Sequence, residues 1–491
     1  MTNPFEQRAT EYLREYSAFL SVVTPEPLHT FFEKPASDGS LHDRLCIVIG
    51  TPGSGKTTIA TLVQYRTIHT LINSPNHSEY KPLHLALSKC KFIKSNKPLV
   101  LSARIPLESQ YRDFWELPYK DELKFCLLKS FLQARTVISW IQSILDTGCS
   151  IGDIRIGFKK DAHGSKDSVG GDAAFSVLEK AIEIEKEIYG ISAALVPPVE
   201  SDLPELSISP YHPFDAISEI IVKNYSKDED LVVQPLVIFD DAHELHPDQL
   251  FRLRDWLSKR ETKISRWILM RLDGQTPESI LQEDLVSSAA IGAETTINNS
   301  RDIRHIWLQS NEDRQTNRKK FREMAKSMAD KYLRLMPVFN RSGLSKFQDI
   351  LNTNPEPIND SNLKKLKQSV DSLQKKNNIS KKIREQIEKD IKQYFEQLPY
   401  YQDSEDVRCS VLKIMLARYL NRIPQASLFE EMEESPPEPN KPLKIDAGVV
   451  EGAKIHLLHE FNRPYYYGIE ALCDASAENA EQFLQLSSRL V

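Results

Sequence analysis

The amino-acid sequence predicts an α/β protein, in which a parallel sheet flanked by helices is followed by a mainly helical C-terminal region. An unbroken apolar run at 45–49 is typical of a strand buried on both faces of a parallel sheet. It leads through a glycine-rich loop into residues with helical spacing. A second apolar run, at 236–239, ends in two aspartates, and after residue 311 the chain is charged and helical in its periodicity.

The glycine-rich loop reads GTPGSGKT and matches G-x-x-x-x-G-K-[ST] at every fixed position. Its place between a strand and a helix is the context that supports this motif. The glycines let the backbone curl so that successive N–H groups point at one anion, and the helix adds the positive end of its dipole. The predicted phosphate-binding residues are Gly50, Thr51, Pro52, Gly53, Ser54, Gly55, Lys56, Thr57 and Thr58.

Two side chains of this loop have specific expected roles. Lys56 would reach the β- and γ-phosphates of a nucleotide, and the Thr57 hydroxyl would bind Mg²⁺. The motif therefore predicts a P-loop NTPase core that uses Mg²⁺. Guanine selection is disfavoured, because the nearest match to an N/T-K-x-D loop, SNKPLV at 95–100, lacks the aspartate.

The second apolar strand supplies the acidic groups that such a site needs. Asp240 would contact Mg²⁺ through water, and Asp241 occupies the position where a carboxylate can polarise the attacking water. Glu244, one turn on, is the alternative base, and His243 is assigned no role. We expect the strand that ends at Asp240 to lie beside the strand that ends at Gly50.

Three further segments read as strands, at 97–107, 266–275 and 303–309, the last of which has the mixed polarity of an edge strand. The strand at 266–275 ends near Arg271 and Asp273. Either side chain could face the γ-phosphate, and a salt-bridged strand end is an equally good interpretation.

Composition argues against a globally basic, a disulfide-rich and a membrane-spanning protein. Charged residues make up 27% and hydrophobic residues 40% of the 491 residues, and the net charge of −6 shows no global basic field. Six cysteines occur without a C-x-x-C pair, which suits a reducing cytosol rather than a disulfide framework. The N-terminus reads as a polar amphipathic helix, and no stretch is apolar enough to cross a membrane. We therefore expect a cytoplasmic protein.

The segment LVIFDDAHELHPDQLFRLRDWL, together with the glycine-rich loop, resembles AAA+ and STAND ATPases. It is especially similar to the acidic strand of origin-recognition-type and transposition-helper ATPases. Lys56, Thr57, Asp240 and Asp241 match that pattern directly. The resemblance implies an ATPase, and it implies that Lys56 and the two aspartates are the catalytic residues and that Thr57 and Asp240 bind the metal.

The tail carries a second resemblance, to the lid helix of AAA+ proteins. In ASAENAEQFLQL, Ser476 and Asn479 match the lid pattern. Glu478 stands where glycine is usual, and Glu481 stands where an arginine often reaches the nucleotide. The tail therefore departs from the pattern at the residue that would sense the nucleotide.

ATPases of these classes often complete their sites across a subunit contact, so the resemblance implies a homo-oligomer or a companion effector protein. The candidate arginine fingers are Arg301, Arg304, Arg314 and Arg318, each of which also reads as a surface ion-pair residue. A stand-alone ATPase of this kind is similar to the ATPase components of bacterial defence systems, which implies an anti-phage role.

The expected domain organisation is a helical segment at 1–40, a P-loop core at 41–310 with an insertion at about 148–232, a charged helical region at 311–429, a linker at 430–442, and a lid-like or winged-helix-like module at 443–491. The helix expected within 108–147 either packs in the core or docks a partner. The lysine-rich stretch in the charged region is a solvated face, a partner contact or a nucleic-acid surface.

The function predicted from these patterns is an ATP-hydrolysing switch that regulates a partner protein or an oligomer. The alternative is an ATP-gated DNA-binding or loader protein with little hydrolysis.

Overall fold

The computed structural model describes residues 3–6, 15–74, 78–159, 165–226, 229–262, 264–274, 302–309, 314–352, 355–397, 403–422 and 443–491. Contacts divide the chain into two compact units. Unit 1 contains residues 1–345 and 476–491, and unit 2 contains residues 346–475. The last residues of the chain therefore belong to the same unit as the predicted P-loop core.

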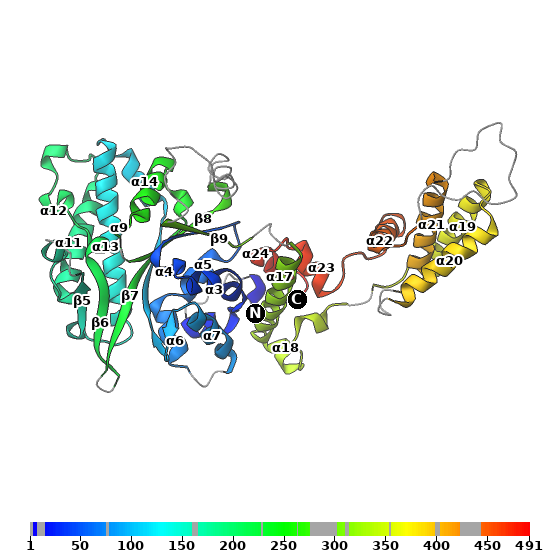
Figure 1. Ribbon diagram of the computed structural model, residues 1–491, viewed down its shortest axis with the longest axis horizontal. Coiled ribbons are helices and arrows are strands. Elements are labelled where there is room, and N and C mark those ends of the chain that lie inside the picture. Colours follow the sequence, from blue (N-terminus) through cyan, green and yellow to red (C-terminus); the bar gives the residue numbers. More distant parts are fainter. Residues whose placement is uncertain are drawn as a thin grey trace. The chain divides into compact units, whose positions relative to one another are not determined.

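The centre of unit 1 is a parallel sheet (Figure 1). Strand β1 (Leu45–Gly50) pairs with β8 (Ser265–Arg271) on one side and with β9 (Ile303–Trp307) on the other. Strand β7 (Glu229–Asp240) pairs in parallel with β8 and with β4 (Val100–Pro106). All six residues of β1 are buried, as the continuous apolar run predicted. The predicted α/β fold with a helical C-terminal region is confirmed.

The order of the strands differs from our expectation at one position. The strand that ends at Asp240 does not lie beside the strand that ends at Gly50, because β8 lies between them. Gly50 is in register with Arg271 at the end of β8. The apolar runs of these strands are alike in composition, so their sequence did not reveal which pairs are neighbours. The consequence is that an arginine ends the strand between the loop and the acidic strand.

The predicted insertion extends the sheet with antiparallel strands. Strand β5 (Ile154–Phe158) pairs with β6 (Ile217–Ser226), and β6 pairs with the first half of β7. The second half of β7 belongs to the parallel sheet. One long strand, β7, therefore joins the insertion rigidly to the edge of the sheet at which Asp240 lies.

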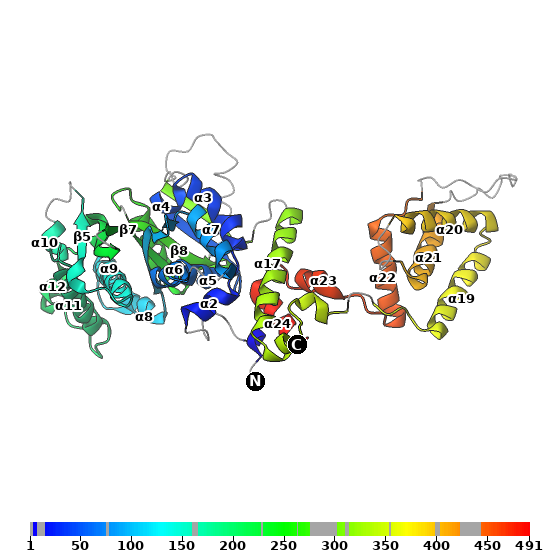
Figure 2. The ribbon, with the colours of Figure 1, turned by 90° about the horizontal axis from the view of Figure 1, so that it is seen from below.

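Two long helices cover this part of unit 1. Helix α9 (Asp121–Leu145) packs against β4, and the indole Nε1 of Trp140 donates a hydrogen bond to the carbonyl oxygen of Leu236 in β7, at 2.9 Å. Helix α11 (Ala174–Ser192) packs on α9 and also contacts β5 (Figure 2). The aromatic residues before α9 are mainly in the core, since Phe114 is 1% exposed.

The helix that follows the glycine-rich loop, α5 (Lys56–Leu62), packs against β1 and β7. Before the sheet, the chain forms α2 (Tyr16–Val22) and a π-helical turn at Leu28–Phe32. After β9 it forms α17 (Arg314–Arg334), which contacts both α2 and the last helix, α24 (Ala480–Ser488).

The two ends of unit 1 also lie side by side. The side-chain amide of Asn3 donates a hydrogen bond to the carbonyl oxygen of Ser488, at 3.0 Å, and the turn at Pro4–Glu6 contacts α24 (Figure 1). The C-terminal helix is thus held within unit 1 from two directions.

Unit 2 is helical. Its helices are α19 (Asp360–Lys376), α20 (Lys381–Glu396), α21 (Glu405–Arg422), α22 (Ala447–Phe461) and α23 (Gly468–Ala475). Apolar side chains of the first four form one core. Arg463 and Asp406 form a buried ion pair with an Nε–Oδ2 distance of 2.6 Å. Unit 2 therefore has a core of its own.

Some predictions fall on residues that the structure does not describe. The linker at 430–442 and Arg301 lie outside the described residues, as does the side chain of Arg314. All six cysteines are described, and all are free thiols. Among the helices that the structure describes, none is both long enough and apolar enough to span a membrane.

Candidate functional site

The glycine-rich loop connects β1 to α5, as its sequence predicted. Gly53 and Gly55 have φ angles of +79° and +90°, a region that favours glycine. Gly55 immediately precedes α5, so the free N–H groups of the helix begin at the loop. A Cβ atom on Gly53 would lie 2.6 Å from the Cβ of Glu481, so the loop also needs glycine where the tail approaches.

Two polar side chains of the loop are unusual in their contacts. Lys56 is buried, and its ammonium donates to the carbonyl oxygens of Gly50 (2.8 Å) and Thr51 (3.0 Å). Burial lowers the pKa of Lys56, while the carboxylates of Asp241 and Asp240 oppose that shift. The hydroxyl of Ser54 is buried without a hydrogen-bond partner in the described chain. A lysine and an unpaired hydroxyl in one loop fit an anion.

The acidic pair at the end of β7 is divided between two environments. Asp240 is fully buried, and its Oδ1 accepts the N–H of Asp241 at 3.0 Å. Its Oδ2 accepts the guanidinium Nε of Arg104 at 2.8 Å. Asp241 lines the cavity beside the loop. Burial, followed by the charge of Asp240, raises the pKa of Asp241 above its ordinary value.

Asp241 also has an uncommon backbone conformation. Its φ of 57° and ψ of 36° are left-handed, where most side chains are strained. Aspartate tolerates this region better than most residues do. Because of this conformation, the side chains of Asp240 and Asp241 point in different directions. The Asp240 carboxylate is buried, and the Asp241 carboxylate faces the cavity.

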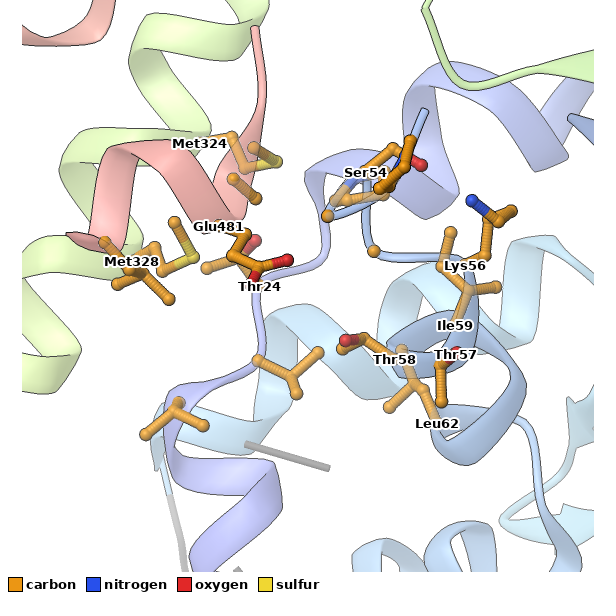
Figure 3. A pocket seen from close by; sticks show the side chains of 18 of the residues that line it. Thr24, Ser54, Lys56, Thr57, Thr58, Ile59, Leu62, Met324, Met328 and Glu481 are labelled. Carbon is orange, nitrogen blue, oxygen red and sulfur yellow. The ribbon is translucent and has the colours of Figure 1, made fainter. Parts of the chain in front are cut away.

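The cavity has a volume of about 520 Å³ and two chemically different ends (Figure 3). The polar end contains the loop with Arg104, Asp241 and Arg271. The other end is mainly apolar, and its residues are Val22, Val23, Pro27, Leu28, Met324, Met328, Tyr332 and Leu484, with Thr24 and Glu481 beside them (Figure 3). Figure 3 shows Met324 and Met328 across the cavity from Lys56 and Thr57. A site with this shape suits a ligand that joins a flat apolar group to a chain of anions.

Sequence reasoning missed Arg104. It lies on β4 and both lines the cavity and pairs with Asp240. The arginine in the mainly buried strand VLSARIP could have indicated this pair, because a charged side chain on a buried strand needs a partner. The residues of the apolar end had no such signal, since they come from three segments that are far apart in the chain, at 22–28, 324–332 and 484.

The structure also separates the candidate sensor residues. Arg271 lines the cavity, and Asp273 does not, although its charge acts on Lys56. Glu244, the alternative base, does not line the cavity, and its Oε1 lies 3.3 Å from His243 Nε2. Among the described finger candidates, neither Arg304 nor Arg318 lines the cavity.

The tail docks on the loop. The side-chain amide of Asn479 donates to the carbonyl oxygen of Pro52 at 2.6 Å, and its Oδ1 accepts the N–H of Gln482, which caps α24. The N–H of Glu481 donates to the carbonyl oxygen of Gly53 at 3.3 Å. Glu481, which stands in place of the arginine of the lid pattern, lines the cavity.

Gln309, just after β9, joins the tail to the loop a second time. Its Oε1 accepts the N–H of Thr51 at 3.3 Å, and its Nε2 donates to the carbonyl oxygen of Glu478 at 3.4 Å. The loop is therefore held between the edge of the sheet and the final helix.

A strand, a phosphate-type loop, a helix and an acidic strand at one edge of a parallel sheet define the core of a P-loop NTPase. A family model described as ORC-CDC6-like matches residues 3–491. The chain therefore belongs to the ORC-CDC6-like family, which is an origin-recognition-type group of AAA+ ATPases. No curated protein and no solved structure matches it. Family membership suggests ATPase activity and implies the use of a nucleotide and Mg²⁺.

Proposed function

We propose that this protein is an ATP-binding and ATP-hydrolysing molecular switch that regulates a partner protein or an oligomer. The observation that supports it most is that the glycine-rich loop, Arg271 and Asp241 line the same cavity as a mainly apolar end. The base and ribose of ATP would occupy the apolar end, and the phosphates would lie along the loop.

Each polar residue then has a role that follows from its position. Lys56 would leave its carbonyl partners and neutralise the β- and γ-phosphates. The Thr57 hydroxyl would hold Mg²⁺, which supplies charge stabilisation to the phosphates when bound. Asp240 is buried and does not line the cavity, so it would contact the ion only through water. Asp241, whose raised pKa brings it closer to the range of a base, would accept a hydrogen bond from the attacking water.

Regulation follows from the connectivity of the chain. Helices α17 and α24 both line the cavity, and unit 2 is the segment between them in the sequence. Any change in how these two helices hold the nucleotide acts on both attachments of unit 2. We propose that nucleotide turnover is transmitted in this way to a companion effector or to another copy of the chain.

The test is nucleotide binding and Mg²⁺-dependent phosphate release by the purified protein. We expect Lys56→Ala to abolish ATP binding, and Asp241→Asn to keep binding and lose turnover. Lys364→Ala, an exposed lysine of α19, is the matched control and should change neither. Wild-type affinity for ATP in the Lys56→Ala variant would overturn the proposal.

The second candidate function is an ATP-gated DNA-binding protein with little hydrolysis. Its support is the turn between α19 and α20, where Lys375, Lys376, Lys381 and Lys382 are all exposed, together with the origin-recognition type of the family. DNA affinity that appears with ATP and falls steeply with salt would favour it. Replacing these lysines with glutamine should then reduce DNA binding while ATP binding is retained.

The resemblance to defence-system ATPases extends the first proposal to an anti-phage role in the cytoplasm. A reduction in plaque formation that depends on Lys56 in a host carrying this gene and its neighbours would support that role, and unchanged plaque formation would contradict it.

A further inference from the structure

Helix α11 in the insertion has one face that is buried in the fold. Val177, Ala181, Ile184 and Ile188 are buried, and the helix packs on α9. Glu185 joins the two helices through an ion pair with Arg135, with an Oε1–Nε distance of 2.7 Å. These contacts fix the orientation of α11 about its own axis, and so they determine which residues face outward.

The outward face carries three large apolar side chains. Phe175 is 59% exposed, Ile182 47% and Tyr189 53%. They are spaced by seven residues, so they form one stripe along the helix, because a straight helix drifts by only about 20° per heptad. Single exposed apolar residues are ordinary, but a stripe of three large ones marks a contact surface. Figure 2 shows α11 at the outer side of this part of unit 1.

Two opposite charges lie within the same stripe. Glu179 is between Phe175 and Ile182, and Lys186 is between Ile182 and Tyr189, and both are exposed. In the part of the chain that the structure describes, neither forms an ion pair. The order along the stripe is therefore an aromatic residue, an acid, Ile182, a base and an aromatic residue. The side chains have nearly the same sequence of sizes when the stripe is followed from its other end.

We propose that this stripe binds the α11 helix of a second copy of the chain, antiparallel, about a two-fold axis that passes close to Ile182. In that arrangement Phe175 faces Tyr189 of the other copy and Ile182 meets its own counterpart. Glu179 lies near Lys186 of the other copy, and the pair occurs twice. A two-fold interface requires a patch that is complementary to itself, and this stripe meets that condition.

The charges select this direction over the alternative. In a parallel pair, Glu179 would face Glu179 and Lys186 would face Lys186, so each charge would be repelled. In the antiparallel pair both contacts are attractive, as are the apolar ones. The order of charges thus supports a second copy as the occupant.

The size of the stripe limits the strength of the contact. Fourteen residue steps along a helix span about 21 Å. A contact that is confined to one stripe of this length buries a small area, at or below the roughly 1,000 Å² at which specific interfaces begin. The dimer is therefore weak and depends on protein concentration. No residue of α11 lines the nucleotide cavity, so dimerisation does not depend on the proposed ATPase activity.

The test is sedimentation of the full chain over a wide range of concentration, with and without ATP. We expect a monomer–dimer equilibrium in both conditions. Glu179→Lys and Lys186→Glu should each raise the dissociation constant by about tenfold or more, which is ~1.4 kcal/mol. The double charge swap should restore dimerisation. A mixture of the two single variants should form a heterodimer, because one stripe is then basic and the other acidic.

The control is Glu385→Lys, a matched charge reversal at an exposed position of α20, which should leave the equilibrium unchanged. Thermal unfolding of each variant separates a lost contact from a lost fold. A chain that stays monomeric at all concentrations overturns the proposal, as does a dimer that none of the stripe variants weakens or a double swap that fails to restore it.

Discussion

The guanidinium Nε of Arg104 donates a hydrogen bond to Oδ2 of Asp240 at 2.8 Å, and this carboxylate is fully buried. The other oxygen, Oδ1, accepts the N–H of Asp241. The two residues are on neighbouring parallel strands, β4 and β7, where Pro106 and Asp240 are in register. Arg104 therefore neutralises the acidic group that we propose to contact Mg²⁺ through water, and it fixes the orientation of that group.

The first prediction concerns this ion pair. Arg104→Met should lower the free energy of unfolding by about 3 kcal/mol, because it leaves a buried carboxylate without its charged partner. Asp240→Asn should rescue much of that loss when the two changes are combined, since no unpaired charge then remains. Chemical denaturation of the wild type, both single variants and the double variant gives the coupling energy. Additive losses would show that the pair does not act as a unit.

The second prediction is a pH dependence at Asp241. Its pKa is raised by burial and by Asp240, so the folded chain binds this proton more tightly than the unfolded chain does. The free energy of unfolding therefore decreases as pH rises from the unfolded pKa to the folded one. Asp241→Asn removes this titration and keeps a residue that tolerates the left-handed backbone.

We therefore expect Asp241→Asn to be more stable than the wild type near neutral pH, with the difference vanishing as pH falls toward about 4. Thermal unfolding across this range checks it. Asp273→Asn, an exposed aspartate after the neighbouring strand, should stay within about 0.5 kcal/mol of the wild type throughout. A destabilised Asp241→Asn protein at neutral pH would contradict the sign.

The third prediction concerns Glu481, whose carboxylate approaches the glycine-rich loop at Gly53. A negative charge beside bound phosphates is repulsive, so Glu481→Gln should increase the affinity for ATP by about tenfold. The gain should shrink as salt is added, because salt screens charges. Glu478→Gln is the control, since Glu478 does not line this cavity. Equal ATP affinities for Glu481→Gln and the wild type would show that this charge does not act on the nucleotide.

The fourth prediction separates backbone strain from close approach at Gly53. Gly53 and Gly148 both have a positive φ, so alanine strains the backbone at either position. Only at Gly53 would the new Cβ meet side-chain atoms of the tail, at 2.6 Å, whereas nothing lies within 4 Å at Gly148. Gly53→Ala should therefore cost about 1–3 kcal/mol more than Gly148→Ala. It should also weaken ATP binding, which Gly148→Ala should not. Equal losses of stability would show that the tail is not held at the loop.

Local patterns were sufficient for the strands of the parallel part of the sheet, whereas β5 and β6 of the insertion were not predicted. The predicted strand at 45–49 is observed at Leu45–Gly50, and the predicted edge strand at 303–309 is observed at Ile303–Trp307. Both follow from short-range preferences, since burial on both faces selects continuous apolar residues and an exposed edge admits polar ones. The turn of the glycine-rich loop follows from residues that are adjacent in the chain.

The sequence by itself determined the loop, the two aspartates and the helical nature of the C-terminal region, because each depends on neighbours in the chain. Only the tertiary structure decided that β8 separates the loop from the acidic strand, that Arg104 pairs with Asp240, and that Asn479 docks on Pro52. These contacts join residues that are far apart in sequence, and their partners are chosen by the packing of whole elements. No local pattern records that choice.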